Sequence, residues 1–238
     1  MKNLLFVILI ISFSACSKDD DPTPVTEKNL EFELSFVSGS SPLQFDTIMY
    51  TNAAGNVYSV SRLQFYISNI QLIKSDSSLV TISDYNYVDA RVPSSLTQKH
   101  SLSESGHFIG MKLQLGLDTA HNKSNFLPAI AENINMVWPD MMGGGYHFMK
   151  FEGYYVDGLS FPGFAMHLGR NAYVANCVIS HSFDLVNGNN KMKLVMDLNE
   201  WFANPHIYDF NIDGNSSMGD MNDLLKLSQN GTDIFTLQ

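Results

Sequence analysis

Cysteine is scarce in this chain of 238 residues, which contains Cys16 and Cys177 and no other. We expect Cys16 to be consumed by processing of the N-terminus, and one remaining cysteine forms no intramolecular disulfide. The fold therefore has to rely on its core and not on disulfide bonds. Cys177 is either a small buried apolar side chain or a soft metal ligand, and we favour the buried side chain.

Basic residues are also few. The chain has 14 Lys and Arg against 24 Asp and Glu, a formal net charge of −10. Residues 1–15 contain one basic residue, Lys2, and no acidic one, so the remainder has 13 basic and 24 acidic residues, a net charge of −11. Nucleic-acid binding depends on basic contacts to phosphate, so we expect none here, and no charge-driven adhesion to an anionic membrane.

Familiar catalytic motifs are missing as well. The sequence has no G-x-S-x-G, no H-E-x-x-H, no P-loop and no G-x-G-x-x-G. A triple glycine at residues 143–145 lacks the lysine and helix of a phosphate-binding loop, and more simply lets the chain turn sharply. We therefore expect a protein that is not an enzyme.

The longest apolar run, residues 4–11, is too short to span a membrane, which takes roughly 20 residues. With Lys2 before it and Phe13-Ser14-Ala15-Cys16 after it, the run is typical of a signal peptide ending in a lipobox. The alternative is a plain signal peptide with an incidental cysteine. We predict a signal peptide over 1–15, a lipidated Cys16 with a tether over 16–28, and one domain over 29–238. Residues 17–21, S-K-D-D-D, resemble the export tag of Bacteroidetes surface lipoproteins, so the expected location is the outer membrane, facing the surface or periplasm.

Long helical patterns are absent, and much of the chain alternates apolar with polar residues between turns. The segment L-E-F-E-L-S-F at 30–36 has the period of a half-buried strand. Further strands are predicted at 60–73, 107–117, 146–156, 164–168, 173–185 and 191–197, and short helices at 126–135, 198–203 and 221–228. Many short strands predict an all-β fold, an antiparallel, immunoglobulin-like β-sandwich with short helices in connections and near the C-terminus.

Residues 133–169 hold a distinctive set of side chains: Trp138, His147, His167 and five methionines. Imidazole and thioether are ligands that suit copper, and thioether suits Cu(I) in particular. Met136, Met141 or Met166 would offer the thioether. The alternative is that the methionines fill irregular gaps in the core and that each histidine is a hydrogen-bonded structural residue.

The same stretch carries a family resemblance. The motifs M-V-W at 136–138, G-Y-H-F-M-K-F-E-G at 145–153 and H-L-G at 167–169 resemble the MbnP-like copper-binding domain family of bacterial surface and periplasmic proteins. Four other blocks stand in the same order as in the family: Y-T-N-A-A-G at 50–55, F-Y-I-S-N-I-Q-L at 65–72, I-G-M-K-L-Q-L-G-L-D at 109–118 and N-G-T-D-I-F near the end. The resemblance covers most of the predicted domain.

The resemblance implies a non-catalytic copper-binding lipoprotein for copper acquisition or handling. Its implied ligands are His121, Trp138, His147 and His167. Protonation of imidazole would release the metal below about pH 6. In the family a tryptophan of this block is oxidised to kynurenine, which implies a dihaem peroxidase-type partner. Here Pro139-Asp140 stands in place of the family's second tryptophan. The alternative function is a surface interaction or adhesion sandwich that has lost the metal.

A second metal motif lies near the C-terminus. Asp209, Asn211, Asp213 and Asp220 occupy positions 1, 3, 5 and 12 of a calcium-loop spacing, with Gly214 at position 6. Position 12 carries the shorter Asp in place of the bidentate Glu. The segment is therefore interpreted in two ways, as a calcium-binding loop or, more simply, as a turn rich in Asn and Asp.

Overall fold

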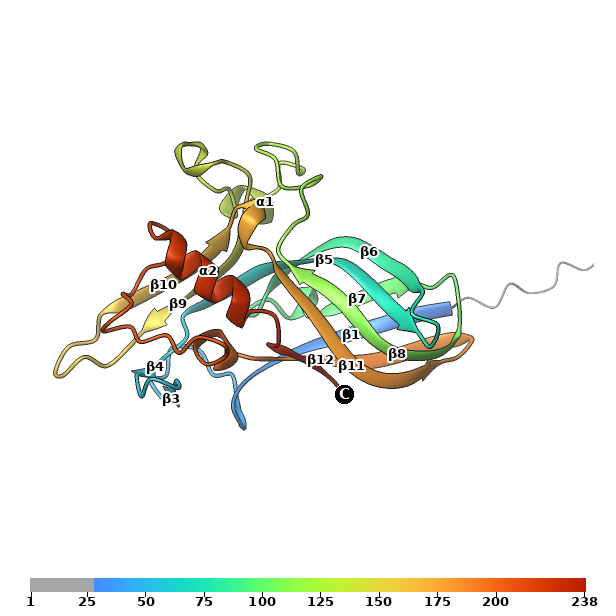
Figure 1. Ribbon diagram of the computed structural model, residues 1–238, viewed down its shortest axis with the longest axis horizontal. Helices are drawn as coiled ribbons and strands as arrows, with labels where there is room; N and C mark the ends of the chain where they lie inside the picture. Colours follow the sequence, from blue (N-terminus) through green and yellow to red (C-terminus); the bar gives the residue numbers. More distant parts are fainter. Residues whose placement is uncertain (1–27) are drawn as a thin grey trace, which may run out of the picture.

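Two β-sheets enclose the core of residues 28–238, the part of the chain that this computed structural model describes (Figure 1). The β-sandwich predicted from the sequence is confirmed. The predicted signal peptide, the lipidated Cys16 and nearly all of the tether lie outside the described residues. Within the described part, no helix is both long and apolar enough to cross a membrane.

The first sheet has the order β13–β12–β1–β2, and β7 also pairs with β1. Its strands are β1 (Lys28–Ser38), β2 (Ser41–Pro42), β7 (Thr97–Ser101), β12 (Gly188–Asp197) and β13 (Phe235–Leu237). As the alternation predicts, Leu30, Phe32 and Leu34 of β1 are buried. One pairing departs from the antiparallel expectation, because β1 and β12 run parallel. No crossover helix is needed, since the whole second sheet lies between these strands in the sequence.

The second sheet has the order β10–β9–β5–β8–β11, with β6 on β5. Its strands are β5 (Arg62–Lys74), β6 (Leu79–Asp89), β8 (Gly106–Leu115), β9 (His147–Tyr154), β10 (Gly163–Gly169) and β11 (Ala175–Leu185). One side of β5 pairs with β6, while the other is divided between β9 at residues 62–65 and β8 at residues 67–74. The sheet therefore forks, and the long connection 116–146 leaves β8 at the fork and returns into β9. A small separate hairpin joins β3 (Tyr50–Thr51) and β4 (Val57–Tyr58).

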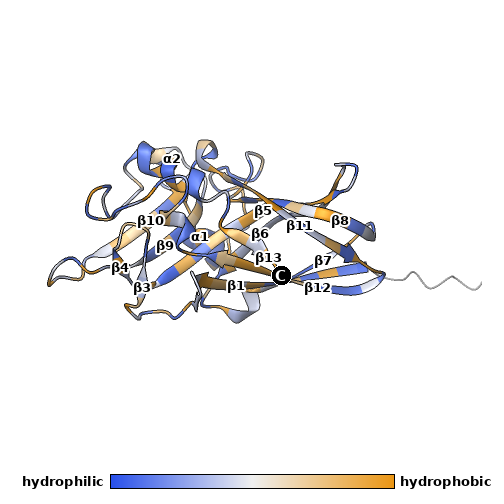
Figure 2. Cartoon of the chain, turned by 60° about the horizontal axis from the view of Figure 1, so that its bottom comes forward, coloured by the Kyte–Doolittle hydropathy of each residue, from blue (hydrophilic) through white to orange (hydrophobic). Residues whose placement is uncertain are grey.

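An aromatic cluster packs around the β9–β10 branch. It consists of Tyr58, Phe151, Phe164, Phe202 and Phe210, whose ring centroids lie 4.7 to 6.4 Å apart. Edge-on and offset ring pairs at such distances add to the free energy of apolar burial. Figure 2 shows apolar and polar residues interleaved along the strands. The strands β5 and β9 are nevertheless buried over consecutive residues, and so on both faces.

Two of the predicted helices form, the first shorter and the second longer than expected. The segment 126–135 is helical only as α1 (Ala131–Asn135), because the Asn133 side chain and the Ile130 amide both donate to the Pro128 carbonyl and hold the preceding residues in a turn. The segment 221–228 extends into α2 (Met221–Asn230), which begins at the capping residue Asp220. Residues 198–203 contain only a 3₁₀ turn, Glu200–Phe202.

Candidate metal site beside the β9–β10 hairpin

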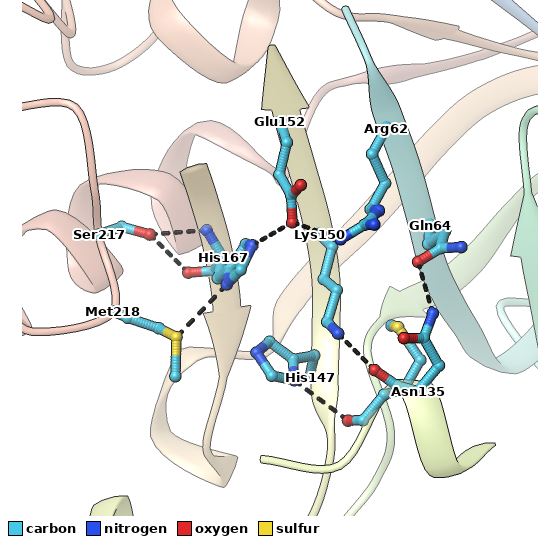
Figure 3. Close-up of polar contacts among 10 residues, drawn as sticks. Arg62, Gln64, Asn135, His147, Lys150, Glu152, His167, Ser217 and Met218 are labelled. Carbon is cyan, nitrogen blue, oxygen red and sulfur yellow. Dashed lines mark hydrogen bonds and ion pairs between the residues drawn. The ribbon is translucent and has the colours of Figure 1, made fainter. Parts of the chain in front are cut away.

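The two histidines of the central stretch lie on neighbouring strands, and their rings contact each other. His167 of β10 pairs with Lys150 of β9, so both point to one face of the sheet, as does Glu152. Strict alternation would send His147 to the opposite face with Met149. An extra residue in β9 opposite Leu168 and Gly169 forms a β-bulge, which re-aims the His147 side chain. The ring centroids of His147 and His167 are consequently 5.0 Å apart (Figure 3).

His147 is held in one tautomer. Its backbone N–H donates to the Met136 carbonyl at 2.6 Å, and its ring Nδ1 contacts the same oxygen at 3.2 Å. A carbonyl oxygen only accepts, so Nδ1 carries the hydrogen and Nε2 keeps its lone pair. In Figure 3 this second nitrogen points to the side where His167 and Met218 lie. Burial, and then the positive charge of Lys150, lower the pKa of His147 to about 3, so the ring stays neutral.

Trp138 packs against this pair from the connection before β9. Its ring centroid is 4.7 Å from that of His147, and it is fully buried. The indole N–H donates to the Met142 carbonyl at 3.2 Å, and the ring covers Gly169, where an added Cβ would lie 2.5 Å from Cε3. Left-handed φ angles at all three residues of the glycine run 143–145 let the chain reverse from the tryptophan into β9.

His167 is oriented by a carboxylate. Its Nε2 lies 2.8 Å from Glu152 Oε1, and Arg62 holds the same oxygen at 2.9 Å. Burial disfavours ionisation of Glu152, but the His167 hydrogen bond and the Arg62 charge outweigh it, so the pKa of this carboxyl lies below its ordinary value. The ionised carboxylate accepts the Nε2 hydrogen, so the other ring nitrogen, Nδ1, points away from Glu152 and lies beside the sulfur of Met218. Metal-binding histidines are commonly oriented by such a partner.

The composition of the site limits what can bind there. In residues 28–238 no group of three or more His, Cys, Asp or Glu is arranged to hold a metal ion. The two histidines are thus the nitrogen donors at this place, and any third ligand has to come from another residue type. Neutral imidazoles without an additional free carboxylate suit a soft, weakly charged ion better than a hard one.

The family follows from the sequence match. Residues 27–219 match the family described as MbnP. The chain belongs to the MbnP family. The solved structure of MbnP from Methylosinus trichosporium shares its fold, with a TM-score of 0.59 and 13% identity over 90% of this chain and 99% of that chain. No curated protein matches this chain.

Of the four residues that the MbnP-like resemblance implies as ligands, the structure brings together Trp138, His147 and His167. His121 makes different contacts: its Nδ1 lies 2.8 Å from Asp118 Oδ1, and its ring contacts Tyr85 and Phe126. His121 therefore belongs to the wall of the 116–146 connection, and its i, i+3 spacing to Asp118 explains that pairing.

The calcium expectation is not supported. Asp213 pairs with Lys226 and accepts from the Asp209 amide, while Asp209 accepts from the side chain of Asn56. Asp220 caps α2 through the Asn222 amide. These carboxylates are engaged as turn and capping groups, so the motif is the simpler Asn- and Asp-rich turn, with Asn211 at its exposed tip.

Three residues of the site were not expected from the sequence. Lys150 and Glu152 stand in the G-Y-H-F-M-K-F-E-G motif, and their spacing places them on one face of β9, a signal that was available. Met218 carries no such signal, because it lies 51 residues beyond His167, yet its sulfur is 3.3 Å from His167 Nδ1. Cys177, by contrast, is buried as expected and contacts the Gly231 carbonyl.

Proposed function

We propose that this chain binds copper at the His147–His167 pair, beside Trp138, and serves in copper acquisition or handling without turning over a substrate. The observation that carries the proposal is the pair itself: two buried or half-buried imidazoles in ring contact, each with one nitrogen bonded to an oxygen acceptor and the other directed away from that acceptor. Copper is also the metal that the resemblance to the MbnP-like family implies, which supports the same proposal.

The surroundings match this role. Glu152 and the Met136 carbonyl fix the tautomers of the two rings, so His167 Nδ1 and His147 Nε2 are the nitrogens that would hold the ion. His147 has a depressed pKa and so does not compete for protons at neutral pH. A bound copper ion would either supply one-electron chemistry or be the cargo that is passed on. The residues of the chain would provide only its binding site.

Trp138 would adjoin the ion in either of two forms. Its indole N–H is a donor and not a ligand, and it is already bonded to Met142. Oxidation to kynurenine, as in the MbnP-like relatives, would place an aryl amine beside His147. We propose a dihaem peroxidase-type partner only for that form, and intact mass of protein purified from its native host would reveal the modification.

Copper content tests the proposal. Metal-free protein, loaded with copper and passed through a desalting column, is expected to retain about one equivalent. His147→Ala/His167→Ala should lose it. His121→Ala is the matched control, since His121 contacts a different set of residues, and it should retain the metal. Equal retention by the double variant would refute the proposed site.

The alternative, an interaction module without metal, has one observation in its favour. The 116–146 connection exposes apolar side chains along its length, at Phe126, Ile130, Ile134, Val137 and Met141, the last with 94% of its surface exposed. Apolar groups gathered on one surface connection are typical of protein contacts. Wild-type protein that folds but retains no metal would favour this second function.

A further inference from the structure

The sulfur of Met218 lies 3.3 Å from His167 Nδ1, the nitrogen that Glu152 leaves free. We propose that Met218 is the third ligand of the copper site, and that its thioether makes the site selective for Cu(I). The inference rests on the proposed function, because it names a ligand and an oxidation state for that same site.

The contact brings together two donor atoms that a soft ion would use. His167 Nε2 faces the Glu152 carboxylate, so the other ring nitrogen, Nδ1, faces the sulfur of Met218. Ligands bound to one ion at about 2.0 Å for nitrogen and 2.3 Å for sulfur lie roughly 3 to 4 Å apart, and the observed separation falls in that range.

The segment just before Met218 is bonded to the edge of β10, which places Met218 beside His167. Ser217 is fully buried; its hydroxyl donates to the His167 carbonyl at 2.7 Å and accepts from the His167 amide at 2.8 Å. The amide of Ala165 donates to the Asn215 carbonyl, and Ser216 forms a parallel bridge to Ala165. Residues 215–217 therefore extend the edge of β10, and Ser217 and Met218 both lie beside His167 (Figure 3). The helix α2 begins at Met221.

The ligand types favour a monovalent ion. Imidazole and thioether ligands without a carboxylate among them suit Cu(I), and Arg62 already engages the Glu152 carboxylate beside His167.

The experiment compares Met218→Leu with Met221→Leu on the full-length protein. Leucine keeps the volume of methionine and removes the sulfur, and Met221 is exposed at the start of α2, three residues along. Cu(I) affinity is measured by competition with a chromophoric Cu(I) chelator, Cu(II) affinity by competition with glycine. Copper-edge X-ray absorption counts sulfur neighbours, and Met218→Gln is a second variant in case the leucine variant folds poorly.

We expect wild type and Met221→Leu to show one sulfur near about 2.3 Å. Met218→Leu and Met218→Gln should lose it, with Cu(I) affinity falling about tenfold or more and Cu(II) affinity falling by a smaller factor. Wild-type protein that binds Cu(I) with nitrogen neighbours alone would overturn the Met218 ligand and leave the proposed function standing. Wild-type protein that binds no copper would overturn the proposed function.

Discussion

Lowering the pH of the metal-free protein should reveal His147 as a destabilising group. In the unfolded chain a histidine has a pKa of about 6.5, whereas burial and Lys150 lower the pKa of folded His147 to about 3. Between these values the unfolded state binds more protons than the folded state. Above about pH 6.5 His147 is neutral in both states and does not lower the free energy of unfolding. As the pH is lowered from there toward 3, the free energy of unfolding falls.

The magnitude follows from the two pKa values. At pH 5 the unfolded histidine is mostly protonated and the folded one is not, which costs about 2 kcal/mol of unfolding free energy relative to pH 7. Urea titrations at pH 7 and pH 5 measure this loss. Carboxylates and other histidines contribute to the wild-type loss as well, so the test is a difference between two proteins.

The comparison protein is His147→Asn, whose side-chain amide nitrogen takes the place of Nδ1 and can still donate to the Met136 carbonyl, but does not titrate. Its stability should fall less than that of wild type between pH 7 and pH 5, by about 2 kcal/mol. Equal pH dependence in the two proteins would show that His147 titrates normally and that its burial is not what keeps the ring neutral. The same depression means that copper release below about pH 6, expected from ordinary histidines, would not start at His147.

Three further outcomes are expected. Gly169→Ala should cost about 1 to 3 kcal/mol in urea denaturation, because the new Cβ meets Trp138, whereas Gly163→Ala on the same strand meets nothing closer than 3.7 Å and should cost little; equal losses would contradict the packing. Cys16→Ser should move the protein from the membrane to the soluble fraction, and a variant that stays with the membrane would exclude the lipid anchor. Glu152→Gln should weaken copper binding about ten- to a hundredfold while leaving the fold intact; unchanged affinity would remove the carboxylate from the site.

Much of the fold was predictable because most of its strands have a local pattern of apolar and polar residues. Alternation in β1 and β8 places their apolar residues in the core, and the turns between strands carry Gly, Asn and Asp. The polar strand β7 gave no such signal, since T-Q-K-H-S lacks apolar residues. The parallel β1–β12 pairing was also beyond local reasoning, because it joins segments some 160 residues apart and depends on how the whole second sheet folds between them.

The site was predictable only to the level of its motif residues, and the structure shows why. Trp138, His147 and His167 come from one stretch, and the family motifs within that stretch contain all three. Their geometry depends on features that alternation does not predict: the bulge that turns His147 toward His167, and the buried Ser217 that brings a methionine from beyond the motif to the free nitrogen of His167. His121 shows the converse, because its ring packs against Tyr85 and Phe126 in the 116–146 connection. The surroundings of each ring, which the sequence does not give, thus select the candidates at this hairpin: one nitrogen on each of His147 and His167, and the sulfur of Met218.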